Sequence, residues 1–364
     1  MFYPHICTKP LKYISYTLVI LIPGLFIILF TIKFGTNVMR WDEFTFAIAQ
    51  SNGDLFLDNF SVVKNYLFKH HNEHLIFFPS VVYWLIGRMT NFNSVAQMII
   101  SNSSLLVLYY AISFVFIKYK GRTSCFTYLI SNFILAGIIL NLSQYDNLLW
   151  AFQLGFNLTF VFSIFAILFF TLFIEYNKTY SFIISIIFCI LASLSSSQGL
   201  LSWIVLLLMY IPKRSNIFNI KGKVLLYLVC LSITFFVFFV SYIHPKHHPS
   251  IFFGFNHPIL FITYYLKSLG GIAGAGTKAN IMGVILLLFS IFAIIYFFKT
   301  KKNLSSLFYF SIGCTIYGLF STGLISLGRS GFGIEQASSS RYVTFTMSVA
   351  IGLFCNCKLF GTPT

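Results

Sequence analysis

The chain has 364 residues, of which 58% are hydrophobic, 20% aromatic and only 9% charged. An ordinary soluble domain carries about 25% charged residues, so the composition excludes that class of protein. The net charge of +16 would favour a nucleic-acid partner in a soluble protein. Here, however, the basic residues gather in short segments between apolar runs. The charge therefore indicates membrane topology, and we expect no nucleic-acid partner.

Apolar runs recur along the chain, and each is long enough to cross a hydrocarbon core of about 30 Å as a helix. They predict an all-α polytopic membrane protein with about ten transmembrane helices, forming a single transmembrane domain over residues 1–364 in the lipid bilayer. The first run is too long for the apolar core of a cleavable signal sequence, so we expect it to remain as an anchor. The predicted spans cover about residues 12–34, 96–117, 125–143, 152–174, 181–197, 200–212, 224–243, 281–298, 304–327 and 343–357.

The clusters of basic residues in the short loops, and Lys358 after the last span, fall on the side of the N-terminus. They are Lys118, Lys120, Arg122, Lys178, Lys213, Arg214, Lys221, Lys223, Lys299, Lys301, Lys302 and Lys358. Because cytoplasmic loops carry an excess of Lys and Arg, this side and both termini are predicted to face the cytoplasm of a bacterial inner membrane. The periplasmic side then carries a long first loop at 35–95 with amphipathic interfacial helices. It also carries a second large loop at 244–280, in which we expect the Gly-rich segment 270–276 to be flexible.

Titratable side chains concentrate on the predicted periplasmic side. Of the eight carboxylates only Glu175 falls on the cytoplasmic side, and of the eight histidines only His5. A functional site is therefore predicted at the periplasmic face.

The first candidate site follows the first predicted span, in the sequence Trp41-Asp42-Glu43-Phe44. Two adjacent carboxylates at the edge of the bilayer are partly desolvated, which can raise the pKa of one of them. Asp42 and Glu43 are therefore candidate catalytic groups, with one serving as a general base. The alternative is a pair of solvated loop charges.

The second candidate site is the run from Lys69 to His74, which contains His71, Glu73 and His74. On a helix His71 and His74 would share a face, with Glu73 next to them. These residues could bind a phosphate or a divalent cation, although their spacing is not that of a zinc protease. A cluster of interfacial histidines without a ligand is the alternative, and the metal stays an open question.

The third candidate site lies between the third and fourth predicted spans and comprises Asp146, Asn147, Trp150 and Gln153. A sugar is bound by aromatic rings on its C–H face and by polar groups on its hydroxyls, so these residues are candidates for binding a sugar or an acceptor, together with Glu73. The alternative is an interfacial aromatic residue with polar neighbours.

The fourth candidate site comprises Arg329 and Arg341, close to the points where the chain leaves and re-enters the membrane. The planar guanidinium fork suits bidentate binding of a phosphate. Arginines that merely extend from the bilayer towards the interface are the alternative.

Together these features resemble the GT-C glycosyltransferases, multi-span enzymes that take a sugar from a polyprenyl-phosphate carrier. The resemblance covers about a third of the chain. It rests on Asp42-Glu43 in a long first outer loop, then Pro79, Tyr83-Trp84, the Asn91–Asn93 turn and the span from about 96. Elsewhere it extends only to topology, to Asp146 and to the late Arg341-Tyr342.

The resemblance implies an inverting glycosyltransferase of the type that decorates O-antigen or other surface polysaccharides. Asp42 would act as the base, and cationic groups would stabilise the departing carrier. One departure is Phe78, because many family members carry Lys immediately before that proline. Carrier-phosphate binding would then fall to His71, His74, Arg329 or Arg341. The implied partners are a polyprenyl-phosphate-linked sugar donor and a glycan or lipid-linked acceptor.

Two other functions stay open at this point. An O-antigen polymerase would also use a polyprenyl-linked substrate, but its cationic residues would concentrate in two large later loops. A lipid-linked sugar flippase or transporter would show inverted repeats and ionisable residues within its spans. The carboxylates in the long first loop favour the transferase over the polymerase. The sequence shows no repeat and almost no charges in the spans, which favours the transferase over the flippase.

Overall fold

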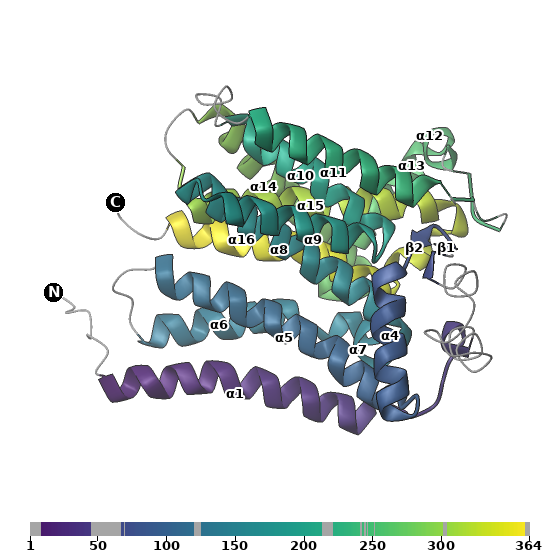
Figure 1. Ribbon diagram of the computed structural model, residues 1–364, viewed down its shortest axis with the longest axis horizontal. Helices are drawn as coiled ribbons and strands as arrows, with labels where there is room; N and C mark the ends of the chain where they lie inside the picture. Colours follow the sequence, from purple (N-terminus) through teal and green to yellow (C-terminus); the bar gives the residue numbers. More distant parts are fainter. Residues whose placement is uncertain are drawn as a thin grey trace.

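The computed structural model of the protein describes residues 9–44, 67–68, 70–119, 125–212, 221–240, 242–243, 245, 247–250, 252–300 and 304–360. Within these residues the chain is helical apart from its connections and one short hairpin, and the long helices run side by side between two ends of the molecule (Figure 1). The first residue of α1 and the last residue of α16 lie at the same end. The prediction of an all-α membrane protein is confirmed.

Each predicted span falls on a helix. These helices are α1 (Lys9–Phe34), α5 (Ser94–Tyr119), α6 (Cys125–Ile139), α8 (Leu154–Tyr176), α9 (Thr179–Ser193), α10 (Leu200–Tyr210), α11 (Lys221–Phe239), α14 (Thr277–Lys299), α15 (Ser306–Arg329) and α16 (Ser340–Phe360). In the described part of the chain, seven helical segments are long and apolar enough to cross a membrane. Helices α9 and α10 are apolar but shorter. The number of about ten crossings therefore stays a prediction.

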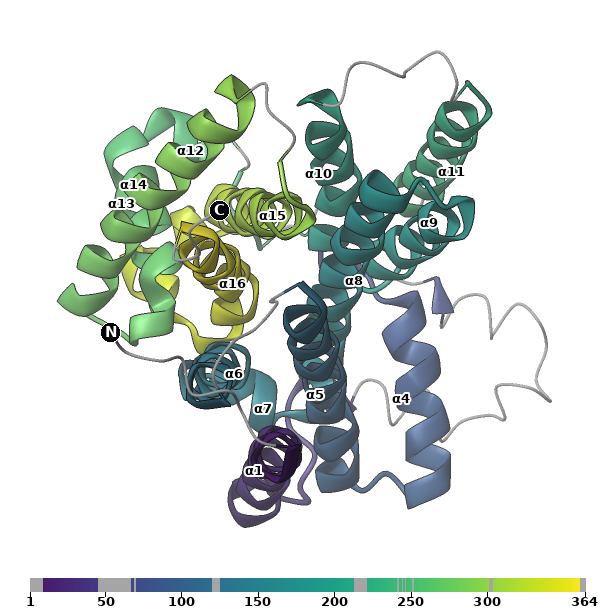
Figure 2. The same cartoon turned by 90° about the vertical axis from the view of Figure 1, so that its left-hand side faces the viewer.

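The centre of the bundle is formed by α8, α15 and α16. The apolar windows of α8 and α15 are 78% and 72% buried, whereas those of α1 and α11 are only 22% and 17% buried. An end-on view accordingly shows α8 and α15 inside and α1 and α11 at the periphery (Figure 2). Close approach of α15 to α16 depends on Gly318 and Gly352, where a Cβ would collide with the facing helix. Small residues at a helix interface are the usual means of tight packing in membranes.

Buried amides join the helices in the interior, and we call Asn102, Asn147 and Asn157 the amide network. The side chain of Asn102 donates to Thr31 Oγ1 on α1 at 2.9 Å. The Asn157 amide donates to the backbone carbonyl of Asn147 at 3.1 Å, and the Asn147 amide donates to the carbonyl of Arg341 at 2.9 Å. These bonds fix the relative positions of α1, α5, α8 and α16, because a polar group left unpaired in this interior would be costly.

Shorter elements cover the end of the bundle opposite the chain ends. They are β1 (His70–His71), β2 (His74–Leu75), α4 (Phe77–Thr90), η1 (Leu142–Gln144), α7 (Tyr145–Leu149), η2 (Ala151–Gln153), η3 (Ser197–Gly199), α12 (Phe253–Asn256), α13 (Pro258–Leu269), η5 (Gly270–Ala273), η6 (Ser330–Phe332) and η7 (Ile334–Ser338). We call this the outer end. Helix α4 falls within the predicted first loop, of which residues 45–66 and 69 lie outside the described residues.

The histidine run forms a β-hairpin and not the helix considered from the sequence. His71 pairs with His74 across the two antiparallel strands, and His70 pairs with Leu75. Asn72 in the turn has a φ of 53°, a left-handed conformation that Asn adopts more readily than most residues. His71 and His74 are therefore neighbours across two strands.

The first part of the Gly-rich segment is a packed turn, whereas a Cβ on Gly274 or Gly276 would meet only open space, so the expected flexibility of this loop stays a prediction. Gly270 and Gly271 are buried in η5. A Cβ on Gly270 would overlap the carbonyl of Ala279, and one on Gly283 would overlap the carbonyl of Leu266. These glycines allow α13 to lie directly against α14.

Candidate functional site

Residues from distant parts of the sequence meet in one cavity at the outer end, which we call the polar cavity. Its volume is about 680 Å³. Among the residues predicted from the sequence, those that line it are Asp42, His71, His74, Gln153, Arg329 and Arg341. The cavity thus combines a carboxylate, imidazoles, an amide and two guanidinium groups.

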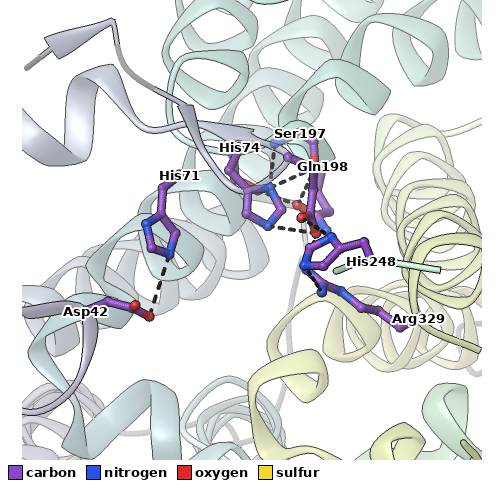
Figure 3. A network of polar contacts seen from close by, with 9 residues as sticks. Asp42, His71, His74, Ser197, Gln198, His248 and Arg329 are labelled. Carbon is purple, nitrogen blue, oxygen red and sulfur yellow. Dashed lines mark hydrogen bonds and ion pairs between the residues drawn. The ribbon is translucent and has the colours of Figure 1, made fainter. Parts of the chain in front are cut away.

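Asp42 enters the cavity from the turn after α1 and faces the hairpin (Figure 3). Its Oδ2 lies 3.6 Å from Nε2 of His71, and the two side chains are 38% and 22% exposed. The hydrogen bond with His71, together with the charges of His71 and Arg341, lowers the pKa of Asp42 despite its partial burial. Asp42 is therefore ionised at neutral pH and can accept a proton from a group that enters the cavity.

Beside this pair lies a second group, which we call the Glu73 cluster: Glu73, His74, His248 and Arg329. Arg329, the last residue of α15, donates from Nη2 to Oε1 of Glu73. His74 Nε2 lies 3.4 Å from Oε1, and His248 Nδ1 lies 3.1 Å from Oε2. Burial opposes ionisation of Glu73, but the charges of its neighbours outweigh it and hold the pKa of that carboxyl below its ordinary value.

The partners of the two histidines fix which ring nitrogen carries the proton. A backbone N–H can only donate, and that of Ser197 donates to Nδ1 of His74 at 3.3 Å. A guanidinium also only donates, and Arg329 Nη1 lies 3.0 Å from Nε2 of His248. In each neutral ring the proton therefore lies on the nitrogen that faces Glu73. Burial lowers the pKa of His74 to about 4, so this ring is neutral at pH 7.

The hairpin is held by the turn η3 between α9 and α10. Ser197 Oγ lies 2.9 Å from His74 Nδ1, and the backbone N–H of Phe78 donates to the carbonyl of Leu194 at 3.0 Å. The oxygen of the Gln198 side chain accepts from Ser197 Oγ at 3.2 Å. Turn η3 thus lies against the Glu73 cluster, with Ser197 and Gln198 next to His74 (Figure 3).

Glu43 does not reach the polar cavity although it follows Asp42 directly. It is fully buried, and Ser94 Oγ, at the start of α5, donates to its Oε2 at 3.1 Å. Burial raises the pKa of the Glu43 carboxyl. The hydrogen bond between Ser94 and this carboxyl links the turn after α1 to α5, so the role of Glu43 is structural.

Most of the third predicted site also lies apart from the cavity. Asp146 accepts a hydrogen bond from Ser340 Oγ at 2.5 Å, and Asn147 belongs to the amide network. Trp150 is buried and meets the ring of Trp41 edge-on at 5.3 Å. These residues join α7 and η2 to their neighbours, and Gln153 alone of this predicted set reaches the cavity.

The proposed metal ligands are divided between the two groups. His71 faces Asp42, whereas His74 faces Glu73. In the residues that the structure describes, no set of three or more His, Cys, Asp or Glu side chains is arranged to hold a metal ion.

A second, larger cavity of about 1280 Å³ begins at the Glu73 cluster, and we call it the apolar groove. It extends between α10, α11 and α15. Its lining residues are Glu73, His74, Phe156, Ser197, Gln198, Leu200, Leu201, Ile204, Phe235, Phe238, Phe239, Tyr242, His248, Leu324, Ile325, Leu327, Gly328, Arg329 and Tyr342. His74, Phe156 and Arg329 border both cavities and form their shared wall. Ile204 and Phe239 are 41% and 52% exposed, so the groove opens towards the bilayer.

No protein-family model, no curated protein and no solved structure matches this chain. The resemblance to GT-C enzymes therefore still rests on the sequence motifs alone.

Sequence reasoning missed His248, Ser197 and Gln198. His248 belongs to a run of histidines in the predicted second outer loop, and that local concentration could have indicated it. Ser197 and Gln198 could be understood only as a tight turn between two spans, since nothing in the local sequence shows that this turn meets the hairpin.

Proposed function

We propose that the protein is an inverting glycosyltransferase that moves a sugar from a polyprenyl-phosphate carrier to a glycan or lipid-linked acceptor. The observation that carries this proposal is the shared wall between the polar cavity and the apolar groove. A lipid-linked sugar has the same division, with a polar head and a long apolar chain joined by a phosphate. One molecule can therefore occupy both spaces.

The carrier phosphate is assigned to the shared wall. Arg329 borders both cavities there, and Arg341 lines the polar cavity. Guanidinium groups in a partly desolvated site bind phosphate oxygens strongly and stabilise the charge of a departing phosphate. Glu73 pairs with Arg329, so an incoming phosphate competes with this carboxylate for the guanidinium.

Asp42 is assigned as the general base. The acceptor hydroxyl gives its proton to Asp42 while its oxygen forms a bond with the anomeric carbon. The bond between that carbon and the phosphate oxygen breaks, and its electron pair leaves with the carrier phosphate. His71 orients the Asp42 carboxylate, and Gln153 offers an amide to the sugar hydroxyls.

The test of the base is transfer from a purified polyprenyl-phosphate sugar by the protein in nanodiscs. Asp42→Asn keeps the shape of the side chain but cannot take a proton, so turnover should fall by about 10²–10⁴-fold. The matched control is Glu43→Gln, which alters the neighbouring buried carboxyl and should leave turnover nearly unchanged.

Normal turnover in Asp42→Asn would exclude this base. A ladder of products of increasing length would instead indicate a polymerase, and movement of the lipid-linked sugar across the bilayer without transfer would indicate a flippase.

The polar cavity is assigned to the periplasmic face of a bacterial inner membrane. This rests on the basic residues at the other end of the predicted spans and on the position of α1 and α16, whose terminal residues lie at the end opposite the hairpin. Reporter fusions at about residue 260 should indicate the periplasm, and fusions at about residue 217 the cytoplasm. The reverse pattern would overturn the assignment.

A further inference from the structure

A third cavity lies at the other end of the bundle, far from the polar cavity, and we call it the α14 groove. Its volume is about 720 Å³, and it is lined by Phe289, Phe292, Ala293, Tyr296, Phe308, Leu353 and Asn356. Its floor is buried, since Phe308 is 4% exposed, whereas its outer wall includes Phe292 at 65% exposure. The groove is therefore open on the side that faces lipid.

Two polar side chains line this largely apolar groove, Tyr296, which is 40% exposed, and Asn356, which is buried. Asn356 is only 5% exposed, and neither its amide nitrogen nor its amide oxygen has a hydrogen-bond partner among the described residues. An amide without partners is costly in a membrane interior, where no water replaces the missing bonds. A ligand that forms hydrogen bonds with both amide atoms removes this cost. A ligand that bonds only one of the two atoms removes part of it.

The length of the groove identifies the kind of occupant. Along α14 the groove extends from Phe289 to Tyr296, a rise of about 10 Å. The hydrocarbon core of a bilayer is about 30 Å thick, so the groove fits within one leaflet. A transmembrane helix of a partner would need contacts over the whole thickness, whereas a lipid of one leaflet needs only half.

The order of side chains along the groove suits a phospholipid. Phe289 and Phe292 lie farthest from the end of α14, where an acyl chain would be placed. Asn356 lies four residues before the end of α16, about 6 Å from the helix end, and its amide can bond an ester group. Lys299, which is exposed, ends α14 three residues after Tyr296, the last lining residue on this helix, and can attract a phosphate.

We propose that the α14 groove binds one phospholipid from the leaflet at the end of the bundle where α1 begins and α16 ends. An acyl chain occupies the groove between Phe289 and Leu353, the Asn356 amide donates to an ester carbonyl, and Lys299 attracts the phosphate. This site is independent of the proposed transferase activity, because it lies at the opposite end of the molecule from Asp42 and Arg329.

The test uses the purified full-length protein, depleted of lipid in detergent and titrated with dioleoyl-phosphatidylglycerol. The lipid should raise the Tm of the unaltered protein, because a ligand that binds only the folded state stabilises it. Native mass spectrometry should show one retained phospholipid per chain. In Asn356→Leu, retention should weaken by about three- to tenfold, the effect of losing one or two hydrogen bonds. Ala293→Phe, which fills the groove, should abolish the Tm shift.

Matched controls come from the same helix. Asn280→Leu removes an amide at the other end of α14, and Ile291→Phe adds a ring at a position that does not line the groove. Both should keep the lipid-dependent shift in Tm. An equal shift in the unaltered protein, Asn356→Leu and Ala293→Phe would overturn the proposal. So would selective retention of a polyprenyl phosphate, or a dimer held together through this groove.

Discussion

Two polar regions of the molecule differ in what surrounds them. In the amide network the donors point to carbonyls and side chains of neighbouring helices, whereas the amide oxygens of Asn102, Asn147 and Asn157 have no hydrogen-bond partner among the described residues. The polar cavity is open, and its charged groups face a space that a ligand can enter. Polar residues at one end of a membrane bundle can therefore serve either the fold or a ligand, and the partners of each side chain decide which.

Neighbouring residues show this difference most directly. Asp42 faces the cavity and is ionised, whereas Glu43 is buried and bonded to Ser94. Arg341 belongs to both regions, because its carbonyl accepts from Asn147 while the residue also lines the cavity. Substitutions in the cavity should consequently affect activity, and substitutions in the amide network should affect stability.

After the loss expected for Asp42→Asn, the largest effect is expected at Arg329. Arg329→Ala should reduce turnover by about 10²–10³-fold, the usual loss when one group that stabilises developing charge is removed. Arg329→Lys should be almost as damaging, because a point charge cannot replace a bidentate fork. Arg88→Ala changes an exposed arginine at the same end and should retain activity. Equal transfer rates in all three variants would show that Arg329 only holds Glu73 in place.

The second effect concerns pH and His74. The unfolded chain binds a proton at this position below pH 6.5, but the folded chain binds one only below about 4. Thermal stability should therefore fall as the pH drops from 6.5 towards 4, by roughly 3 kcal/mol in total at about 1.4 kcal/mol for each pH unit. His74→Gln keeps an acceptor for Ser197 and should flatten this dependence. His257→Gln changes an exposed histidine and should not. A pH profile unchanged in His74→Gln would mean that other groups control acid stability.

A smaller effect is expected in the amide network. Asn147→Leu leaves the carbonyl of Arg341 and the hydroxyl of Thr344 without this donor. The variant should lose about 1–3 kcal/mol of stability in thermal unfolding. Asn256→Leu, at an exposed position, should lose much less. If Asn147→Leu instead unfolded like the unaltered protein and had lost activity, the network would belong to the site.

The sequence predicted the helices well because each apolar run is a local property. It predicted the Asp42 and Arg329 positions as polar groups at the outer end, but it could not show that they meet, since they are contributed by the turn after α1 and by the end of α15. The same limit applies to Asp146 and Asn147, because an aspartate and an asparagine suit a sugar-binding site as well as they suit a structural contact. Their bonds to Ser340 and Arg341 depend on how α7 packs against α16.

The hairpin was misread for a different physical reason. His71 and His74 have the spacing of two residues on one helical face, and no strand pattern can be recognised in strands of two residues. Asn72 adopts a left-handed conformation, which a continuous right-handed α-helix does not allow. Contacts with η3, whose residues follow more than a hundred positions later, then hold the turn in place.

The short helices on either side of η3 bear on the membrane itself. With 15 and 11 residues, α9 and α10 rise by only about 22 and 17 Å, less than the 30 Å of a typical hydrocarbon core. As two of the predicted membrane crossings, these helices would either place the turn that supports His74 below the bilayer surface or require the bilayer to thin locally. The cost of thinning rises with lipid chain length. The activity that depends on the Glu73 cluster should for this reason vary with bilayer thickness, because long-chain lipids would displace the turn that supports the cluster.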